Sequence, residues 1–545
     1  MIVKMLHLDL LCVAAEVDST LDALRSLGAV HLDLSSAQGA EVAAAKGEAA
    51  DAEKAVRFIL KARGKGEPGN VQRTCLEVLA VQKSIDEKKD SLEDLNREIA
   101  KYEPYGDFDP ALAKKLLDRG IDLAGVAELP EVLPPKRLSE MMSDAAELTS
   151  SIENDISLLA ATDEQAIISS FPELSERIAF AAAKELMLEK GAVSVISGWI
   201  PARALAELKN AAVKEGWGLL TREAVSDENP PTLIEPPKLF RPMRALFEGL
   251  GIAPAYTESD VSVPFMCYFS LFFAMLVGDG AYGSIFLFGT LAMRKKLPRS
   301  WFVLLTVFSA STVVWGVLSN TWFGAQIPAL ASLPTVQWLA DPSYHNMMLL
   351  CFTIGVSHLM LARLWNGVCR LPDSTSIAEF GWAGILLFMY LVTNSIVGIF
   401  PSIPQWGFYT FYASLAGVFL FSVKPSELKT RGAELGMLPL NIMSALGDII
   451  SYVRLFAVGL ASVKVAENFN SMATGLVAGA DEFWVKALMA VAMVAILVVG
   501  HALNLAMAGL SILVHAVRLN TLEFSNHKGV SWSGTAYSPF KRKKV

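Results

Sequence analysis

The chain has 545 residues, 53% of them hydrophobic, and a mean hydropathy of +0.40, which excludes an ordinary soluble protein. Charge is unevenly spread along it. Residues 1–260 hold 29 Lys and Arg against 44 Asp and Glu, whereas residues 261–545 hold 18 against 11. We therefore predict an acidic soluble part followed by a membrane part.

Several function classes find no support in the sequence. The five cysteines are widely spaced without a CxxC pair, which indicates neither a disulfide framework nor a zinc site. No GxxxxGK[ST] loop occurs, so we expect no ATP hydrolysis on this chain and no cofactor. Residues 1–10 carry charges and lack a small-residue cleavage site, so we expect no signal peptide and a cytoplasmic N-terminal half.

The soluble part begins with a predicted α/β lobe. Residues 2–13 favour a strand, residues 17–28 a short helix that ends at Gly28, and residues 29–34 (AVHLDL) a second strand. Residues 192–201 and 204–216 predict a further strand and helix, which indicate another lobe.

Long, thin helices are predicted between these lobes. Residues 41–63 and 71–103 are rich in Ala, Glu, Lys and Leu, and the turn at 64–70 lets them pack antiparallel. A further helical run spans 138–190, and the Pro-rich residues 228–242 predict an extended linker. We expect a coiled-coil rod, for which a passive spacer or an oligomerising coil is as good an interpretation as a docking role.

Eight apolar segments predict an all-α membrane domain. They centre on 263–277, 281–293, 301–319, 347–366, 377–399, 407–423, 438–469 and 484–519. The first two form either a hairpin that turns at GDGAYG (278–283) or one broken helix. With the hairpin, the basic clusters all face the cytoplasm, while the predicted outward loops contain no Lys or Arg. We therefore predict eight spans and two cytoplasmic termini.

Arg454 and Arg518 lie inside predicted spans, where a charged side chain costs about 2.5–3.5 kcal/mol on insertion scales and usually marks a functional pathway. Each shares a helical stripe with small or polar residues. The first stripe holds Gly447, Ser451, Arg454, Val458 and Ala461; the second holds Asn504, Ser511, His515 and Arg518, with His501 at its edge. Small faces allow another helix to approach, and a polar stripe can hold water and pass a cation.

Structural alternatives stay open for these residues. Arg454 is also suited to a structural ion pair with Asp448 or Glu467, and Arg518 to a contact with lipid headgroups. Lys464 and Glu467, three residues apart, favour a local pair or an outer vestibule. His515 alone is more often a satisfied polar residue than a proton relay.

The motifs carry a family likeness. SYVRLFAVGLA (451–461) and VHAVRLNTLEF (514–524) resemble the seventh- and eighth-span signatures of the a/I subunit of rotary V-type ATPases. Further similarities lie in MLVGDGAYG (275–283), SGWIP (197–201), the Pro-rich linker with AYTESD (255–260), and YSPF (537–540). Together they cover nearly the whole chain.

The resemblance implies a membrane stator subunit of a bacterial or archaeal V/A-type complex, in the plasma membrane. Its expected partners are the proteolipid c ring, E/G-type peripheral stalks, a d/C-type central-stalk subunit and lipid, with no nucleic acid. Arg454 would meet the ring carboxylate, and Arg518 would be its companion. Ser462 stands where eukaryotic members have histidine, and Ala508 where they have an acid.

The expected fold is therefore two-part. Cytoplasmic α+β lobes joined by an antiparallel coiled-coil rod occupy 1–240, a linker 241–262, and an ion-translocating domain of eight helices, the last two long and tilted, 263–545. The expected channel lining is Asp448, Ser451, Glu467, His501, Asn504, Ser511 and His515, and H⁺ and Na⁺ both remain open as the ion. Two alternative functions are a secondary ion-coupled transporter and a membrane-anchored coiled-coil interaction protein. The first would be expected to show an internal repeat of its spans, and the second has no need of two buried arginines on successive spans.

Overall fold

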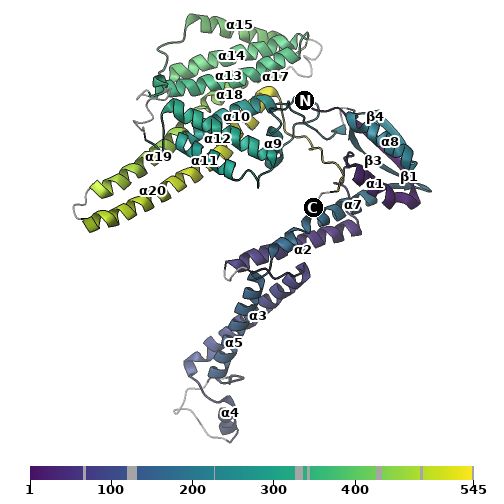
Figure 1. Ribbon diagram of the computed structural model, residues 1–545, viewed down its shortest axis with the longest axis vertical. Helices are drawn as coiled ribbons and strands as arrows, with labels where there is room; N and C mark the ends of the chain where they lie inside the picture. The colour runs from purple at the N-terminus through teal and green to yellow at the C-terminus, as the bar shows by residue number, and fades with distance from the viewer. Residues whose placement is uncertain are drawn as a thin grey trace. The chain divides into compact units, whose positions relative to one another are not determined.

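The computed structural model describes residues 1–64, 69–119, 130, 132–225, 228–325, 336–340, 344–424, 433–478 and 483–542. The chain divides into two compact units (Figure 1). One unit comprises residues 6–223 and 538–545, and the other comprises residues 1–5 and 224–537. The chain therefore passes from one unit to the other three times.

A four-stranded sheet organises the first unit, in the order β2-β3-β1-β4. The prediction of two separate lobes is therefore wrong: the strand at 192–201 lies beside the first strand in one sheet, and both share one core. The strands are β1 (Met5–Val13), β2 (Leu188–Lys190), β3 (Val193–Pro201) and β4 (Gly218–Glu223). β1 pairs antiparallel with β4, with Leu6 opposite Glu223. Leu8, Leu10 and Cys12 alternate into the core, as expected for a sheet with one covered face.

Helices α1 (Val17–Leu27) and α8 (Leu205–Glu215) pack on this sheet and each ends at a left-handed glycine, as predicted for the first at Gly28. The predicted strand over 29–34 is wrong. His31 forms one bridge to Trp199, but the Asp33 carboxylate accepts hydrogen bonds from both the backbone and the hydroxyl of Ser35. This local turn competes with further pairing.

The segment after residue 537 completes the core of the same unit. Phe540 is buried among its apolar residues, and the Phe540 amide donates to the carbonyl oxygen of Val30 at 2.7 Å. His31 Nδ1 lies 2.9 Å from the Ser538 carbonyl oxygen. A lobe made mainly from the first 223 residues is therefore sealed by residues that follow the membrane helices.

Six helices extend from this lobe: α2 (Ala40–Arg63), α3 (Cys75–Tyr102), α4 (Pro110–Asp118), α5 (Leu138–Ala160), α6 (Glu164–Ile168) and α7 (Phe171–Glu185). As predicted, 41–63 packs against 71–103: α2 and α3 share a buried apolar cluster that includes Ile59 and Val78. Ion pairs show that α2 also packs against α7, through Glu48 and Arg177 at 2.6 Å, and α3 against α5, through Lys88 and Asp155 at 2.6 Å. Part of the turn predicted at 64–70 lies outside the described residues.

The second unit is helical, and every apolar segment of the sequence forms helix. Its main helices are α9 (Met243–Leu250), α10 (Ser262–Val277), α11 (Gly280–Ala292), α12 (Arg299–Ser319), α13 (His345–Cys369), α14 (Thr375–Ile396), α15 (Gln405–Phe421), α18 (Leu438–Ile450), α19 (Val453–Ala478) and α20 (Phe483–Ser511). Within the described ranges, five helical stretches are long and apolar enough to cross a membrane: 299–319, 345–369, 375–396, 438–476 and 484–528.

The first pair of apolar segments forms two helices, α10 and α11, that are separated by a break. Gly278 takes a left-handed conformation (φ +69°) that ends α10, and the Asp279 carboxylate caps α11 by accepting from the amides of Ala281 and Tyr282. Its second oxygen accepts from the Gly324 amide at 2.8 Å. This capping geometry explains why the helix breaks at the GDGAYG motif.

The predicted linker is extended but firmly paired. The Thr232 amide donates to the Thr535 carbonyl at 2.7 Å, and the Val3 amide donates to Leu233 at 2.9 Å. Helix α9 lies within the stretch 241–262, where the sequence predicted only a linker.

Candidate functional site

Arg454 lies just after a break between α18 and α19. Ser451 and Tyr452 separate the two helices, and i→i−3 hydrogen bonds from Tyr452, Arg454 and Leu455 tighten the chain there. The guanidinium is partly buried, and its Nη1 atom is buried without a hydrogen-bond partner among the described residues. The charged side chain of Arg454 therefore extends from the irregular turn between α18 and α19.

The structural ion pairs considered for Arg454 do not form. The Asp448 carboxylate lies 3.0 Å from His527, and Glu467 pairs with Lys464 at 2.7 Å. Across the part of the chain that the structure describes, Arg454 has no ion pair with an acidic residue. Its positive charge therefore has no acid within ion-pair distance in those described ranges, although Glu523 acts on it electrostatically from further away.

Arg518 lies between two π-helical segments, η8 (Ile512–Ala516) and η9 (Leu519–Phe524). π-helical turns hold more residues than α-helical ones, so the single stripe from Asn504 to Arg518 expected for a regular helix is interrupted after Ser511. Arg518 is half-exposed, and its Nε lies 3.4 Å from the Glu523 carboxylate. It is therefore paired within the chain, unlike Arg454.

Glu523 is a buried acid that the sequence analysis did not select. Besides pairing with Arg518, its carboxylate lies 3.5 Å from the Ser451 hydroxyl and interacts electrostatically with Arg454. The residue stands in the quoted motif VHAVRLNTLEF, five positions after Arg518, and that motif was the available signal. Glu523 joins the two arginine-bearing segments.

A polar cavity of about 600 Å³ lies on the cytoplasmic side of Arg454 in the predicted topology. Its wall includes Asp448, and His527 lies between Asp448 and Arg363, whose Nε donates to His527 Nδ1 at 3.1 Å. Arg363 and Arg370 both pair with the buried Glu379, at 3.2 and 2.8 Å. A charged network thus reaches from the cavity to the turn of α18 before Arg454.

A hydrogen-bonded chain lies on the opposite side of Arg454. The Ser462 hydroxyl donates to Asn504, whose amide nitrogen donates to the Tyr282 hydroxyl at 3.1 Å. Tyr282 in turn lies 2.7 Å from His501 Nδ1, and His501 Nε2 lies 3.2 Å from Asn470 Oδ1. Asn504 donates through its NH₂ group, so the Tyr282 hydroxyl donates to Nδ1 and His501 is protonated on Nε2.

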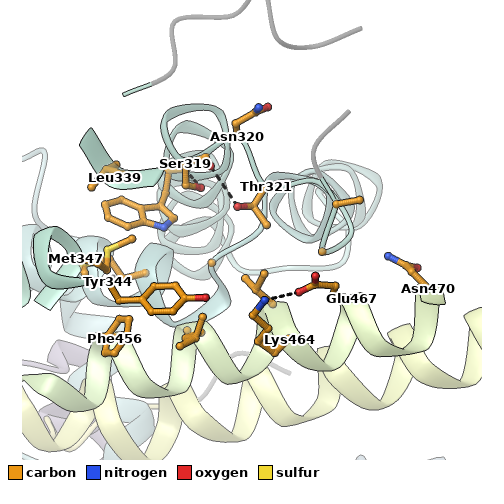
Figure 2. Close-up of a pocket in the computed structure, with 18 of the residues that line it drawn as sticks. Ser319, Asn320, Thr321, Leu339, Tyr344, Met347, Phe456, Lys464, Glu467 and Asn470 are labelled. Atoms are coloured by element: carbon orange, nitrogen blue, oxygen red, sulfur yellow. Dashed lines mark hydrogen bonds and ion pairs between the residues drawn. The ribbon is translucent and has the colours of Figure 1, made fainter. Parts of the chain in front are cut away.

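This chain leads to a vestibule of about 560 Å³, shown in Figure 2. Asn470 lines it together with the Lys464–Glu467 ion pair on α19. The remaining wall is mixed, with aromatic side chains such as Phe456 and polar ones such as Asn320 and Thr321. The local pair expected for Lys464 is confirmed, and Glu467 lies in the vestibule rather than near Arg454.

The predicted site residues do not all come together. Asp448 and Ser451 lie toward the polar cavity, while Asn504, His501 and Glu467 lie along the hydrogen-bonded chain and the vestibule. His515 interacts electrostatically with both arginines, and its Nδ1 atom is buried without a partner among the described residues. Ser511 ends α20 at the first π turn. Tyr282 and His527 were missed because other helices contribute them.

No protein-family model matches the chain. V-type ATP synthase subunit I of Borreliella burgdorferi is 34% identical over 373 residues, which are 64% of this chain and 60% of that protein. V-type ATP synthase subunit I 1 of Treponema pallidum is 28% identical over the full length of both chains.

A-type ATP synthase subunit I of Methanocaldococcus jannaschii is 25% identical over 83% of this chain and 68% of that protein. The similarity thus extends from bacterial V-type to archaeal A-type proteins and includes a match along the whole chain. The chain is a homologue of the V-type and A-type ATP synthase subunit I proteins.

Proposed function

We propose that this chain is the membrane stator subunit of a V/A-type rotary ATPase and forms the ion path beside a rotating proteolipid ring. The observation that carries the proposal is the position of Arg454: a partly buried guanidinium at a helix break, without an acidic partner among the described residues. A buried charge without a close partner is costly, which favours a counter-ion from outside the chain.

A carboxylate of the ring supplies that counter-ion. The guanidinium stays protonated at any accessible pH, and an opposite charge at short range lowers the pKa of a carboxyl group. A ring carboxylate that reaches Arg454 therefore releases its ion, and further rotation lets it rebind an ion from the other side. The fixed positive charge of Arg454 also blocks direct passage of cations between the two access routes.

The exposed face of α20 supports a ring of this kind. Nine large apolar side chains along it and the following π turn are each about half or more exposed: Val491, Val494, Val498, Val499, Leu503, Met507, Leu510, Leu513 and Val514. This face suits contact with apolar helices or lipid rather than water. In the proposal, part of it faces the ring and the rest faces lipid.

Two access routes meet near Arg454. The cavity beside Asp448 and His527 provides the cytoplasmic route, and the vestibule with Asn470, His501, Tyr282 and Asn504 provides the outer route. Each route spans only part of the membrane, so the ion must ride on the ring carboxylate between them. Arg518, neutralised by Glu523, belongs to the border between the routes.

The remaining parts of the chain are proposed to hold the subunit stationary while the ring rotates. Helices α2 to α7 are proposed to form the coiled-coil rod that holds E/G-type peripheral stalks, with a lobe contacting the d/C-type subunit. The membrane unit is proposed to cross the plasma membrane eight times, with both termini in the cytoplasm, and the predicted boundaries 1–240, 241–262 and 263–545 keep the status of a proposal.

Replacement of Arg454 tests the function. The intact complex carrying Arg454→Lys or Arg454→Ala is reconstituted in vesicles, and ATP-driven ion uptake is measured with H⁺ and with Na⁺. We expect Arg454→Ala to abolish uptake and Arg454→Lys to be strongly impaired, because a buried lysine can lose its proton and lacks the planar guanidinium. Full coupled transport by both variants would contradict the proposal.

A further inference from the structure

Tyr452, two residues before Arg454, is held in a tightly fitted socket. Its side chain is fully buried, and it belongs to the break between α18 and α19, where i→i−3 hydrogen bonds replace the regular helical pattern. Gly355 of α13 lies against the tyrosine ring: a Cβ atom at Gly355 would be 2.6 Å from Tyr452 Cγ. Any larger residue at 355 would displace the ring.

The hydroxyl end of Tyr452 is fixed as well. It lies 2.9 Å from Nδ1 of His358, which is one turn after Gly355 on the same face of α13. One helix therefore contacts both the ring and the hydroxyl of Tyr452. This double contact defines the direction in which the chain enters α19.

His358 also contacts the second arginine-bearing segment. Its fully buried imidazole is stacked between Tyr268 of α10, with ring centroids 4.0 Å apart, and Phe524, at 4.4 Å. Phe524 directly follows Glu523, the carboxylate that pairs with Arg518. A single side chain thus holds a neighbour of Arg454 and a neighbour of Glu523.

Helix packing alone does not require a histidine here. His358 Nε2 is buried without a hydrogen-bond partner among the described residues, which lowers stability compared with an apolar ring of similar size. Phenylalanine would keep both stacking contacts and remove the unpaired nitrogen. What it would lose is the hydrogen bond to Tyr452.

We propose that His358, Tyr452 and Gly355 are positioning residues for Arg454: they hold its guanidinium in register with Glu523 and with the ring carboxylate. This inference rests on the proposed ion-transfer function. The socket acts through the tight turn at Ser451–Tyr452, because a displaced Tyr452 shifts the first turn of α19 and the arginine within it. Arg454 itself makes the contact with the moving acid.

The test uses His358→Phe, Tyr452→Phe and the double variant. Each single change deletes the hydrogen bond between His358 and Tyr452 but keeps an aromatic ring at the substituted position. The intact complex in vesicles yields ions transported per ATP hydrolysed and passive ion leak without ATP. We expect each single variant to lower the transport ratio about five- to tenfold and to raise the leak, from the loss of one buried hydrogen bond. The double variant should be no worse, because both changes remove the same contact.

Matched controls separate positioning from stability. Tyr409→Phe removes a hydroxyl from an exposed ring on α15, and Gly289→Ala adds a methyl group where nothing lies within 4 Å. Both should transport normally, whereas Gly355→Ala should resemble Tyr452→Phe. His358→Gln, which can still bond to the Tyr452 hydroxyl, should recover part of the ratio that His358→Phe loses.

The outcomes distinguish this inference from the proposed function. If Arg454→Ala abolishes transport but Tyr452→Phe leaves the ratio and the leak unchanged, the socket has no positioning role. An unchanged ratio per assembled complex, with only the yield of complex reduced, would likewise exclude that role. Should His358→Phe fail to assemble, Tyr452→Phe decides, since it removes one oxygen atom. Normal transport by Arg454→Ala would overturn the proposed function itself.

Discussion

His527 Nε2 lies 3.0 Å from the Asp448 carboxylate, while its Nδ1 accepts a hydrogen bond from Arg363 Nε at 3.1 Å. Because arginine only donates, Nδ1 is the acceptor and Nε2 carries the hydrogen that Asp448 receives. The His527 imidazole therefore connects the cation of Arg363 with the anion of Asp448 on two different helices. Both charged residues line the polar cavity.

This arrangement predicts the effect of Asp448→Asn. The change keeps an oxygen that can accept the His527 hydrogen but removes its charge, so we expect slower ATP-driven ion uptake and a loss of about 1 kcal/mol in stability. Uptake in vesicles and thermal unfolding in detergent measure the two effects. Asp373→Asn is the control, because Asp373 pairs with Lys424 in an exposed position outside the cavity. Uptake equal to that of the control would contradict the proposed inner route.

Tyr282→Phe tests the outer route. The variant keeps the buried ring but removes the hydroxyl that links Asn504 to His501, which interrupts the hydrogen-bonded chain in its middle. We expect ion uptake to fall several-fold, while ATP hydrolysis by the detached catalytic sector is unaffected. Stability should change by about 1 kcal/mol for the lost bonds. Normal uptake with an intact complex would exclude Tyr282 from the route.

Asp279→Ala should destabilise the membrane unit. The substitution removes a helix cap, worth about 1 kcal/mol, and leaves the buried Gly324 amide unpaired, which costs about 1–3 kcal/mol more. Thermal unfolding of the complex in detergent measures the loss. Asp279→Asn should recover part of it, because its side-chain oxygen can still accept from one of these amides. Equal stability of Asp279→Ala and the parent would show that the cap is dispensable.

Acid should loosen the segment 538–542 from its lobe. Burial lowers the pKa of His31 below its usual 6.5, even though the hydrogen bond with Ser538 acts in the opposite direction. The undocked state therefore binds the proton more tightly, so docking is unaffected well above pH 6.5 and weakens as the pH falls below it toward the lowered pKa.

Hydrogen exchange at the Phe540 amide, which donates to Val30, reports this docking. Protection corrected for the intrinsic exchange rate should fall between about pH 7.5 and about pH 5.5, a window that brackets the usual histidine pKa. His31→Gln does not titrate and should remove the pH dependence. The same dependence in both proteins would assign the effect to another group.

Much of the fold followed from local sequence patterns. Apolar runs and left-handed glycines such as Gly28 predicted the helices, because these signals depend only on neighbouring residues. The packing of α2 against its neighbour α3 followed from the turn between them, but long-range pairing did not: α2 also packs against α7 through Glu48 and Arg177, 129 positions apart, and no local pattern reveals such a partner. The strand expected at 29–34 failed because the side chain of Asp33 turns the backbone.

The residues of the candidate site show the same contrast between local signals, which are visible in the sequence, and contacts between distant residues, which are not. Arg454 and Arg518 were found because a charge within an apolar run is visible in one segment. His527, Tyr282 and His358 each act through residues on other helices, so only the folded chain brings them to the arginines. The π turns around Arg518 were also unpredictable, since the sequence there fits a regular α-helix equally well.

The burial of Phe540 in the lobe has a consequence for biosynthesis. The ribosome makes β1 and α1 first, but the apolar cluster that they enclose lacks one of its aromatic side chains until the membrane helices have been translated. The lobe therefore stays incomplete throughout membrane insertion. A nascent chain that stalls before residue 540 therefore leaves part of this apolar cluster exposed.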